Sequence, residues 1–344
     1  MTRSLPIMVA LALGGFAVTS CGETDPTQPN TAGETSPTEP SFVLAANSWT
    51  ALPPIPTGRQ NLDAAVVNNS LGQPILYVVG GYNPRDEMVG AVEAYNYSTK
   101  QWTTKRAIGG SLETNGVGVI GGKLYISGGV TEHGDGYEPH SALVVYDPVR
   151  DAFTTKASMP RAASNGVTGV IGGRLYVLIG LCGADCTHGL TRRLYRYDPS
   201  TNGWNASLPW CPNAHVFGAG GVINGRFYVA GGVDANGTAS ARLDVYNPAT
   251  NSWKALAPMP SAVTSGAGAV INNKLYVMGG SVSKTVYSYD PVTNRWTTRA
   301  PMLTGRYSLA AASLITPSGN PKILAVGGFT SDERGFTANE LYTP

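Results

Sequence analysis

The hexapeptide LYVMGG at residues 275–280 belongs to a pattern that recurs along the chain. Five other segments end in nearly the same way: LYVVGG at 76–81, LYISGG at 124–129, LYVLIG at 175–180, FYVAGG at 227–232 and ILAVGG at 323–328. Each is a short apolar run that ends in one or two glycines, which is typical of a strand followed by unusual backbone angles. Six copies, about 50 residues apart, indicate a repeat architecture.

Each copy is the centre of a larger repeated unit. A strand of small residues precedes it, and an aromatic strand follows it after a loop of variable length. The aromatic strand carries a Tyr, and a Trp or Phe comes seven positions later: Tyr95/Trp102, Tyr146/Phe153, Tyr197/Trp204, Tyr246/Trp253 and Tyr289/Trp296. This constant interval fixes the register of a hairpin. Each unit is therefore predicted to form four strands, a to d.

The period, the paired glycines and the Tyr-to-Trp spacing resemble the kelch motif of β-propellers. The resemblance implies an all-β, six-bladed kelch-type β-propeller with four-stranded antiparallel blades. The sixth unit reaches Pro344 without a strand d, whereas Ser48-Trp49-Thr50 reads as a strand d that has no strands a to c before it. We therefore expect the N-terminal strand to join the last blade and close the ring.

Residues 1–20 have the pattern of a bacterial lipoprotein signal peptide. Arg3 supplies a positive start, an apolar stretch follows, and residues 18–21, Val-Thr-Ser-Cys, resemble the lipobox. The resemblance implies acylation of Cys21; an ordinary secretory peptide is the alternative. Residues 21–46 are rich in Pro and Thr and read as a disordered tether, and residues 47–344 form the propeller. We expect an exported protein that is lipid-anchored to the bacterial envelope, at the outer membrane if the cell has two membranes.

Composition and motifs narrow the function. Charged residues make up 13% of the chain and the formal net charge is +2, which is too balanced for a nucleic-acid binder. No Gly-x-Ser-x-Gly, phosphate loop or His-Glu-x-x-His sequence is present, so no catalytic motif is recognised. We expect no cofactor, a monomer, and membrane contact through the lipid anchor alone.

The two faces of the predicted propeller differ in their loops. The a–b turns are short, whereas the b–c loops are long and varied, as at residues 82–91 and 130–140. Strand direction puts the b–c loops on the same face as the d–a crossovers between blades, and all four histidines of the chain fall there. Variable loops on a rigid scaffold usually carry binding. The leading prediction is a binding module that holds a glycan, a peptide or an envelope protein on this face.

Aligning the starts of the inner strands gives candidate ligand-binding residues. Arg59, His215 and Arg306 occupy corresponding positions in blades one, four and six, Glu113 lies one position further on, and Tyr307 follows Arg306. Ring closure makes blades six and one neighbours, so the two arginines could hold one anion. The alternative is that each arginine pairs with an acidic loop residue such as Asp86, Asp332 or Glu333.

A second resemblance gives the alternative function. The exported sialic-acid mutarotases are also six-bladed kelch propellers and act on a carboxylated sugar. The likeness implies that Arg59, Arg306, Glu113 and His215 supply a carboxylate clamp and acid–base groups. The chain would then be a mutarotase or epimerase acting on an anionic sugar.

The remaining cysteines, Cys182, Cys186 and Cys211, lie on the same face. In an oxidising compartment a disulfide is the common outcome, so we expect Cys211 to bridge to Cys182 or Cys186. A zinc site built from these cysteines, His188 and His215 has suitable ligand types but is the less favoured reading, and no metal site is predicted.

Overall fold

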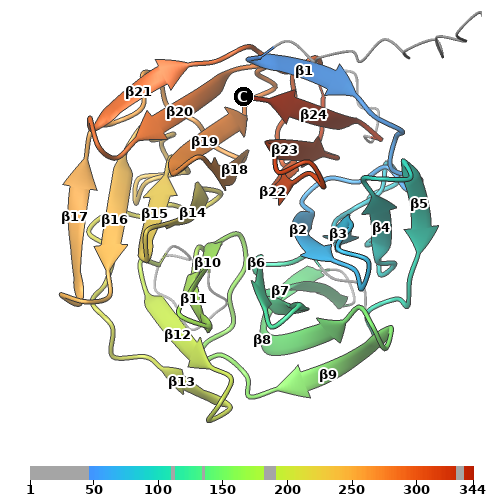
Figure 1. The fold of residues 1–344 in the computed structure, drawn as a ribbon. Helices are drawn as coiled ribbons and strands as arrows, with labels where there is room; N and C mark the ends of the chain where they lie inside the picture. The colour runs from blue at the N-terminus through green and yellow to red at the C-terminus, as the bar shows by residue number, and fades with distance from the viewer. Residues whose placement is uncertain (1–45, 110–112, 134–135, 182–190, 331–336) are drawn as a thin grey trace, which may run out of the picture. The chain divides into compact units, whose positions relative to one another are not determined.

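The computed structural model describes residues 46–109, 113–133, 136–181, 191–330 and 337–344. These residues form 24 strands in six four-stranded antiparallel sheets, arranged as the blades of a propeller (Figure 1). No helix among the described residues is long and apolar enough to cross a membrane. The fold predicted from the repeat is therefore confirmed. The expected signal peptide, the tether as far as residue 45, and Cys21 lie outside the described residues.

Five blades follow the chain order, with strand a innermost and strand d outermost (Figure 1). Blades 1 and 2 comprise β2 (Asp63–Asn68), β3 (Pro74–Val79), β4 (Glu93–Asn96), β5 (Gln101–Thr104), and β6 (Gly116–Ile120), β7 (Lys123–His133), β8 (Gly136–Asp147), β9 (Ala152–Lys156). Blades 3 and 4 comprise β10 (Val167–Ile171), β11 (Arg174–Leu178), β12 (Leu194–Asp198), β13 (Gly203–Asn205), and β14 (Ala219–Ile223), β15 (Arg226–Ala230), β16 (Leu243–Asn247), β17 (Ser252–Leu256). Blade 5 comprises β18 (Gly266–Ile271), β19 (Lys274–Gly279), β20 (Val286–Asp290) and β21 (Arg295–Thr298).

Blade 6 is built from both ends of the propeller sequence. Its strand order is β22 (Ala310–Ile315), β23 (Pro321–Val326), β24 (Asn339–Thr343) and β1 (Ser48–Ala51). Trp49 of β1 lies opposite Tyr342 of β24, and their ring centroids are 5.1 Å apart. The prediction that the N-terminal strand closes the ring is confirmed.

A repeated set of polar contacts fixes strand c to strand d and each blade to its neighbour. In five blades the buried Tyr hydroxyl of strand c donates a hydrogen bond to a side-chain oxygen just before strand d: Tyr146 to Asp151, Tyr197 to Asn202, Tyr246 to Asn251, Tyr289 to Asn294 and Tyr342 to Asn47. The Trp indole of strand d donates to a backbone carbonyl of the preceding crossover, as from Trp204 to Ala157. The aromatic repeat is thus structural.

Glycines of the inner strands let neighbouring blades approach closely. A Cβ atom on Gly268 of β18 would lie 2.5 Å from the backbone nitrogen of Gly220 in β14. Any side chain at this point would push the two inner strands apart, so the close approach accounts for the small residues of strand a.

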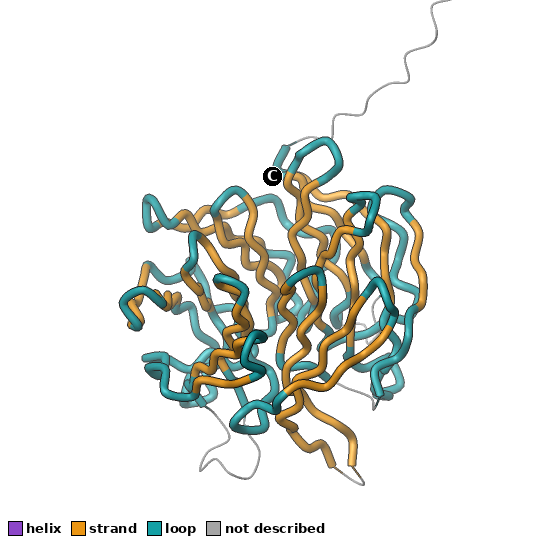
Figure 2. Tube along the Cα trace, turned by 60° about the horizontal axis from the view of Figure 1, so that its bottom comes forward, coloured by secondary structure: helices purple, strands orange, loops and turns teal. Residues whose placement is uncertain are grey.

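One predicted loop is a regular hairpin. Residues 130–140 were expected to be a b–c loop, but β7 continues to His133 and β8 begins at Gly136. The two strands pair from Gly129/His140 to His133/Gly136. The register of the pairing shifts between Ser127 and Gly129. The hairpin projects past the described loops of the neighbouring blades (Figure 2).

Candidate functional site at the mouth of the channel

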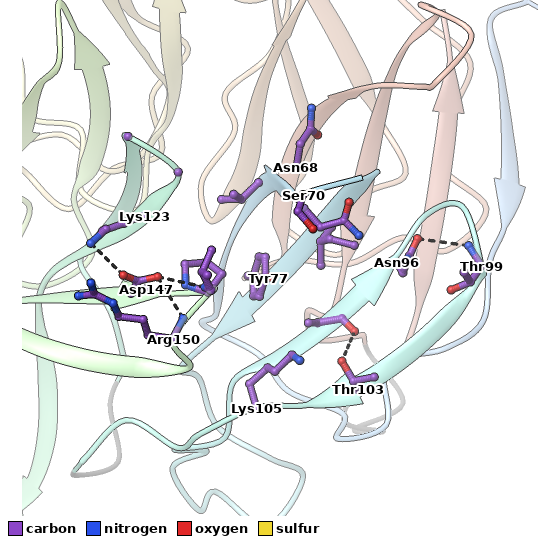
Figure 3. Close-up of a pocket in the computed structure, with 18 of the residues that line it drawn as sticks. Asn68, Ser70, Tyr77, Asn96, Thr99, Thr103, Lys105, Lys123, Asp147 and Arg150 are labelled. Carbon is purple, nitrogen blue, oxygen red and sulfur yellow. Dashed lines mark hydrogen bonds and ion pairs between the residues drawn. The ribbon is translucent and has the colours of Figure 1, made fainter. Parts of the chain in front are cut away.

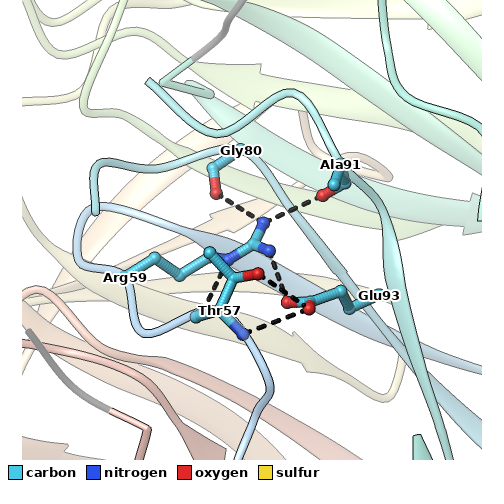
Figure 4. A network of polar contacts seen from close by, with 5 residues as sticks. All are labelled: Thr57, Arg59, Gly80, Ala91 and Glu93. Carbon is cyan, nitrogen blue, oxygen red and sulfur yellow. Dashed lines mark hydrogen bonds and ion pairs between the residues drawn. The ribbon is translucent and has the colours of Figure 1, made fainter. Parts of the chain in front are cut away.

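We call the face that carries the b–c loops and the d–a crossovers the loop face. Beneath it, a basic side chain of the crossover pairs with a buried acid in three blades. Arg59 is 0% exposed and forms an ion pair with Glu93, the first residue of β4. Its guanidinium also donates to the carbonyl oxygens of Thr57, Gly80 and Ala91, while the Glu93 carboxylate accepts from the Thr57 backbone and hydroxyl (Figure 4). The guanidinium is therefore fully engaged within blade 1.

Arg306 repeats this arrangement in blade 6. It is 0% exposed, and its Nη1 lies 2.6 Å from Glu340 Oε1. It also donates to the carbonyl oxygens of Thr304 and Ala325, and the backbone N–H groups of Leu303 and Thr304 donate to the Glu340 carboxylate. The two arginines thus serve separate blades and do not share an anion at the surface.

His215 takes the corresponding place in blade 4 and is 2% exposed. Its Nε2 lies 2.9 Å from Asp244 Oδ2, and its Nδ1 lies 2.7 Å from the Gly231 carbonyl oxygen. The alignment of Arg59, His215 and Arg306 is therefore correct, but all three point into their own blades. Of the two alternatives left open by the sequence, the geometry supports pairing with acids, and the partners lie on strand c.

Blades 3 and 5 show what these positions do elsewhere. There the crossover residue is Ala163 or Val263, and the corresponding strand-c residue is Tyr195 or Tyr287, opposite Val177 or Val277 of strand b. Each pair packs in an apolar cluster. A charged pair and an apolar pair are thus interchangeable at this position, which indicates a structural role.

The acidic partners Glu93, Asp244 and Glu340 were missed by the sequence analysis, although a signal was available. Each stands two positions before the repeated Tyr of strand c, and an acid occurs there only in the three blades whose crossover carries Arg or His.

The mouth of the central channel is lined by one residue from each crossover. Five of these residues have positive φ: Asn61, Asn165, Phe217, Ser265 and Ser308. Their backbones form a chain of inter-blade hydrogen bonds 2.7–2.9 Å long, from Asn61 N to Ser308 O, Ser308 N to Ser265 O, Ser265 N to Phe217 O, and Phe217 N to Asn165 O. The mouth is therefore a rigid backbone ring on which side chains can be held in fixed positions.

Blade 2 breaks this ring and replaces it with side chains. The Thr114 hydroxyl donates to Asp63 of blade 1, and Asn115 Oδ1 accepts from the Gly166 backbone of blade 3 at 3.0 Å. The Tyr82 hydroxyl donates to Glu113 Oε2 at 3.0 Å. We call Asp63, Tyr82, Glu113, Thr114 and Asn115 the mouth cluster. Four of its members, all but Tyr82, line a cavity of about 90 Å³ at the mouth.

The mouth cluster brings two carboxyl groups together. Burial raises the pKa of Glu113 to about 7, with a further rise from the nearby Asp63 and an opposing effect of the Tyr82 hydrogen bond. Burial also raises the pKa of Asp63, against the Thr114 hydrogen bond. Neither carboxyl forms an ion pair with any residue in the described ranges. Of the predicted residues, Glu113 thus lines the cavity at the mouth of the channel.

Tyr307 and Trp210 complete the loop face. Tyr307 is half-buried and packs on Phe329, with ring centroids 5.3 Å apart. Trp210 is 52% exposed, and the Arg193 guanidinium lies 4.3 Å from its ring centroid. The sequence analysis missed Trp210, although the other five tryptophans all occupy the strand-d position and Trp210 alone departs from the repeat.

The cysteines and histidines of the loop face are only partly described. Cys211 is a free, buried thiol in the described part of the chain, whereas its expected partners Cys182 and Cys186, and His188, lie outside it. The predicted disulfide therefore stays a prediction. His140 is half-buried, and burial lowers the pKa of its imidazole.

A larger cavity of about 850 Å³ opens between blades 1 and 2 among the a–b and c–d turns, on the face opposite the loops (Figure 3). Tyr77 lies in it, and Lys105, Lys123 and Arg150 are among its lining residues. Lys123 forms an ion pair of 2.8 Å with Asp147. This cavity holds no carboxyl or imidazole that is both buried and without an ionic partner, so the mouth cluster is the stronger candidate site.

Comparison with known proteins agrees with the fold. Residues 119–328, more than half of the chain, match the family model described as KLHDC2/KLHL20/DRC7 Kelch-repeats domain. Kelch-like protein terF of Aspergillus terreus is 29% identical over 199 residues, which cover 54% of this chain and 42% of that protein. Kelch repeat and BTB domain-containing protein 12 of Homo sapiens is 27% identical over 181 residues, 48% of this chain and 28% of that protein. The chain thus spans less than half the length of these curated relatives.

The solved structure of YjhT superposes with a TM-score of 0.69 at 18% sequence identity, covering 84% of this chain and 96% of that one. At this identity the likeness concerns the fold alone. The repeat, the six closed blades and the family match lead to one conclusion. The chain belongs to the kelch-repeat β-propeller family.

Proposed function

We propose that the protein is a binding module that holds its ligand on the loop face, with the mouth cluster at the centre of the contact. The observation that carries this proposal is the pair of neighbouring carboxyls, half-buried Asp63 and buried Glu113, whose described partners are hydroxyl groups and not cations. Burying a carboxylate costs free energy unless donors or a cation compensate it. A ligand that presents hydroxyl or ammonium groups would supply that compensation.

This chemistry favours a particular class of ligand. Arg59 and Arg306 are engaged inside their blades, so these two residues do not form the guanidinium clamp that a carboxylated sugar would need. A glycan rich in hydroxyl groups, an amino sugar, or a peptide with a Lys or a free amino terminus fits two carboxyls better. Trp210 offers an exposed aromatic surface on the same face, of the kind on which sugars and peptides pack.

The test is a binding measurement on matched variants. The purified chain is first screened against glycan and peptide arrays, and the best ligand is then titrated by calorimetry. Glu113→Gln and Asp63→Asn should each weaken binding by about tenfold or more, because a hydrogen bond to a charged group contributes roughly 1.5–3 kcal/mol. The control is Asp198→Asn, which removes a carboxylate from the face opposite the loops and should leave binding unchanged. Wild-type affinity in both mouth variants would refute the proposal.

A second candidate is the mutarotase-type activity, and one observation favours it. A carboxyl whose pKa is about 7 can both give and take a proton near neutral pH, as interconversion of sugar anomers requires. The expected substrate is a neutral or amino sugar, because Arg59 and Arg306 are paired with acids inside their own blades. NMR exchange spectroscopy of sugar anomers tests this: Glu113→Gln should abolish any acceleration. Absence of acceleration by the wild-type chain would exclude this activity and leave the binding proposal intact.

Attachment to the cell envelope is part of the same proposal. The motivation is the lipobox-like sequence ending at Cys21. Cys21→Ser should release the protein from the membrane fraction or leave the leader uncleaved. Intact mass and fractionation measure both, and unchanged values would refute the anchor.

A further inference from the structure

Blade 4 differs from the other blades at three positions that meet inside it. In the other five crossovers the residue four positions before the one that corresponds to His215 is a buried apolar side chain: Ile55, Ile108, Met159, Met259 and Met302. In blade 4 this residue is Cys211. The set Met302, Arg306 and Glu340 of blade 6 is thus replaced in blade 4 by Cys211, His215 and Asp244.

The three replacements bring together three possible metal ligands. The Sγ atom of Cys211, a ring nitrogen of His215 and a carboxylate oxygen of Asp244 all lie within 4.8 Å of one another. Cys211 Sγ lies 3.9 Å and His215 Nε2 lies 2.9 Å from Asp244 Oδ2. Tetrahedral zinc with bonds of about 2.0–2.3 Å needs ligand separations of about 3.3–3.8 Å, so shifts of about 1 Å or less suffice.

The hydrogen bonding of His215 supports a cation at this point. Its Nδ1–H donates to the Gly231 carbonyl oxygen at 2.7 Å, which leaves the lone pair of neutral imidazole on Nε2, facing the Asp244 carboxylate. A proton on Nε2, or a metal ion bound between the two atoms, makes this contact favourable. A backbone carbonyl that orients the second ring nitrogen is the usual support of a metal-bound histidine.

Asp244 provides an independent observation. Its Oδ1 is buried and has no hydrogen-bond partner among the described residues. The arginine blades fill the corresponding space with a guanidinium, whereas the shorter His215 and Cys211 leave one carboxylate oxygen without a donor. An orphaned carboxylate oxygen in a fully buried site is costly, and a metal ion would remove that cost.

We propose that Cys211, His215 and Asp244 bind a Zn²⁺ ion inside blade 4, in place of the buried arginine of blades 1 and 6. Binding replaces the thiol proton of Cys211, which is released to solvent. The fourth ligand is the side-chain oxygen of Asn213, whose amide nitrogen now lies 2.8 Å from Asp244 Oδ2 and whose amide can be turned over. Asn213 is half-buried beside the exposed Pro212, which gives the ion a path from the loop face. The proposal departs from the expected disulfide at Cys211.

The experiment measures metal in the full chain. Protein expressed with zinc should contain one Zn²⁺ per chain by elemental analysis, and Cys211→Met, which restores the residue of blades 3, 5 and 6, should remove it. Loss of a direct ligand should weaken zinc affinity by more than the roughly 10–100-fold caused by loss of an outer-shell partner. Replacement of zinc by Co²⁺ should give a thiolate-to-cobalt absorption band that is missing in Cys211→Ser.

The control is the double variant Cys182→Ser/Cys186→Ser, which should keep the ion and its absorption band. A chelator should lower the midpoint of thermal unfolding of the wild type, zinc should restore it, and neither should affect Cys211→Met. Three results would overturn the proposal. These are a reduced wild type that binds neither Zn²⁺ nor Co²⁺, Cys211 found in a disulfide by peptide mass spectrometry, or an ion that is lost with Cys182 and Cys186 but kept in Cys211→Met.

Discussion

At the residue scale, Arg59 and Arg306 show why a cation at the rim of a propeller need not be a ligand site. A guanidinium at 0% exposure has lost its hydration and requires compensation on every side. Glu93 or Glu340 supplies the charge, and backbone carbonyls of the same blade accept further N–H groups, whereas Arg306 Nε has no hydrogen-bond partner among the described residues. The planar fork thereby fixes the crossover to strands b and c of its own blade.

Arg306→Lys should therefore lower stability and leave ligand binding unchanged. A Lys ammonium cannot reach Glu340, Thr304 and Ala325 together, so at least one charged hydrogen bond is lost, at about 1.5–3 kcal/mol. Urea denaturation measures the loss. An equally stable variant would show that the pair is dispensable.

Comparison with blade 5 suggests a second substitution that should restore the stability lost when Arg306 is replaced. The double variant Arg306→Val/Glu340→Tyr copies Val263 and Tyr287 of blade 5 into blade 6. Replacing a buried ion pair by apolar side chains is often neutral or stabilising, whereas Arg306→Met alone leaves a buried carboxylate and should cost about 3–5 kcal/mol. The double variant should be clearly more stable than Arg306→Met; a double variant no more stable than the single one would contradict the equivalence of blades.

The raised pKa of Glu113 makes the stability of the protein depend on pH. Because the pKa of Glu113 is raised to about 7, the folded state favours the protonated carboxyl. Its contribution to stability is largest below about pH 4.5 and is lost as the pH rises through 7. A shift of about 2.5 units corresponds to roughly 3 kcal/mol at most. Glu113→Gln should thus stabilise the protein at pH 8 and have little effect at pH 5. Equal effects at both values, from denaturation curves, would be inconsistent with the raised pKa.

At the element scale, blade 1 lacks the hydrogen bond that joins the Tyr of strand c to the start of strand d in the other blades. The Tyr95 hydroxyl of blade 1 is buried without a hydrogen-bond partner among the described residues, and the position that holds Asn or Asp in the other blades is Lys100. Lys100 also has a φ of 61°, which Asn adopts at a lower cost.

Lys100→Asn should raise the free energy of unfolding by about 1 kcal/mol, because it gives the Tyr95 hydroxyl an acceptor and relieves the backbone. Differential scanning calorimetry would show this as a higher midpoint. The control is Asn294→Lys in blade 5, which removes the acceptor of both the Tyr289 hydroxyl and the Ala257 backbone N–H and should lower the midpoint by a larger amount. A drop in both variants would mean that Lys100 contributes in another way, such as through its contact with the Tyr97 ring.

At the scale of the whole molecule, the features that recur in every blade could be predicted from the sequence. The contacts that differ from one blade to another could not. Six copies of one pattern defined the strands, the blade count and the closure. The partners of Arg59 and Arg306 were missed because an ion pair depends on which side chains of strand c face the crossover, and Glu93 was not aligned with Glu340. Asp63 was missed because it meets Thr114 only where blade 2 breaks the ring at the mouth. The hairpin at residues 130–140 was missed because its polar sequence reads as a loop.

Ring closure is the property of the whole molecule that depends on one short strand. Trp49 is buried, its indole N–H donates to the Ala300 carbonyl oxygen at 2.9 Å, and Asn47 accepts from the Tyr342 hydroxyl at 2.8 Å. These contacts join residues more than 250 positions apart, so their loss opens blade 6 and exposes the edge of β24.

Trp49→Ala should lower the free energy of unfolding by about 3–5 kcal/mol, as expected for truncation of a buried aromatic side chain. Deleting residues 47–52 should cost more, because it removes the backbone pairing of β1 with β24 as well as the indole. Trp102→Ala is the matched control: it removes the same repeat residue from blade 1, whose four strands are continuous in the chain, and leaves every strand in place. Chemical denaturation and light scattering would compare the three proteins. The deletion variant alone should associate through its uncovered strand edge, and a deletion variant that is monomeric and as stable as Trp102→Ala would disprove the role of β1 in closing the ring.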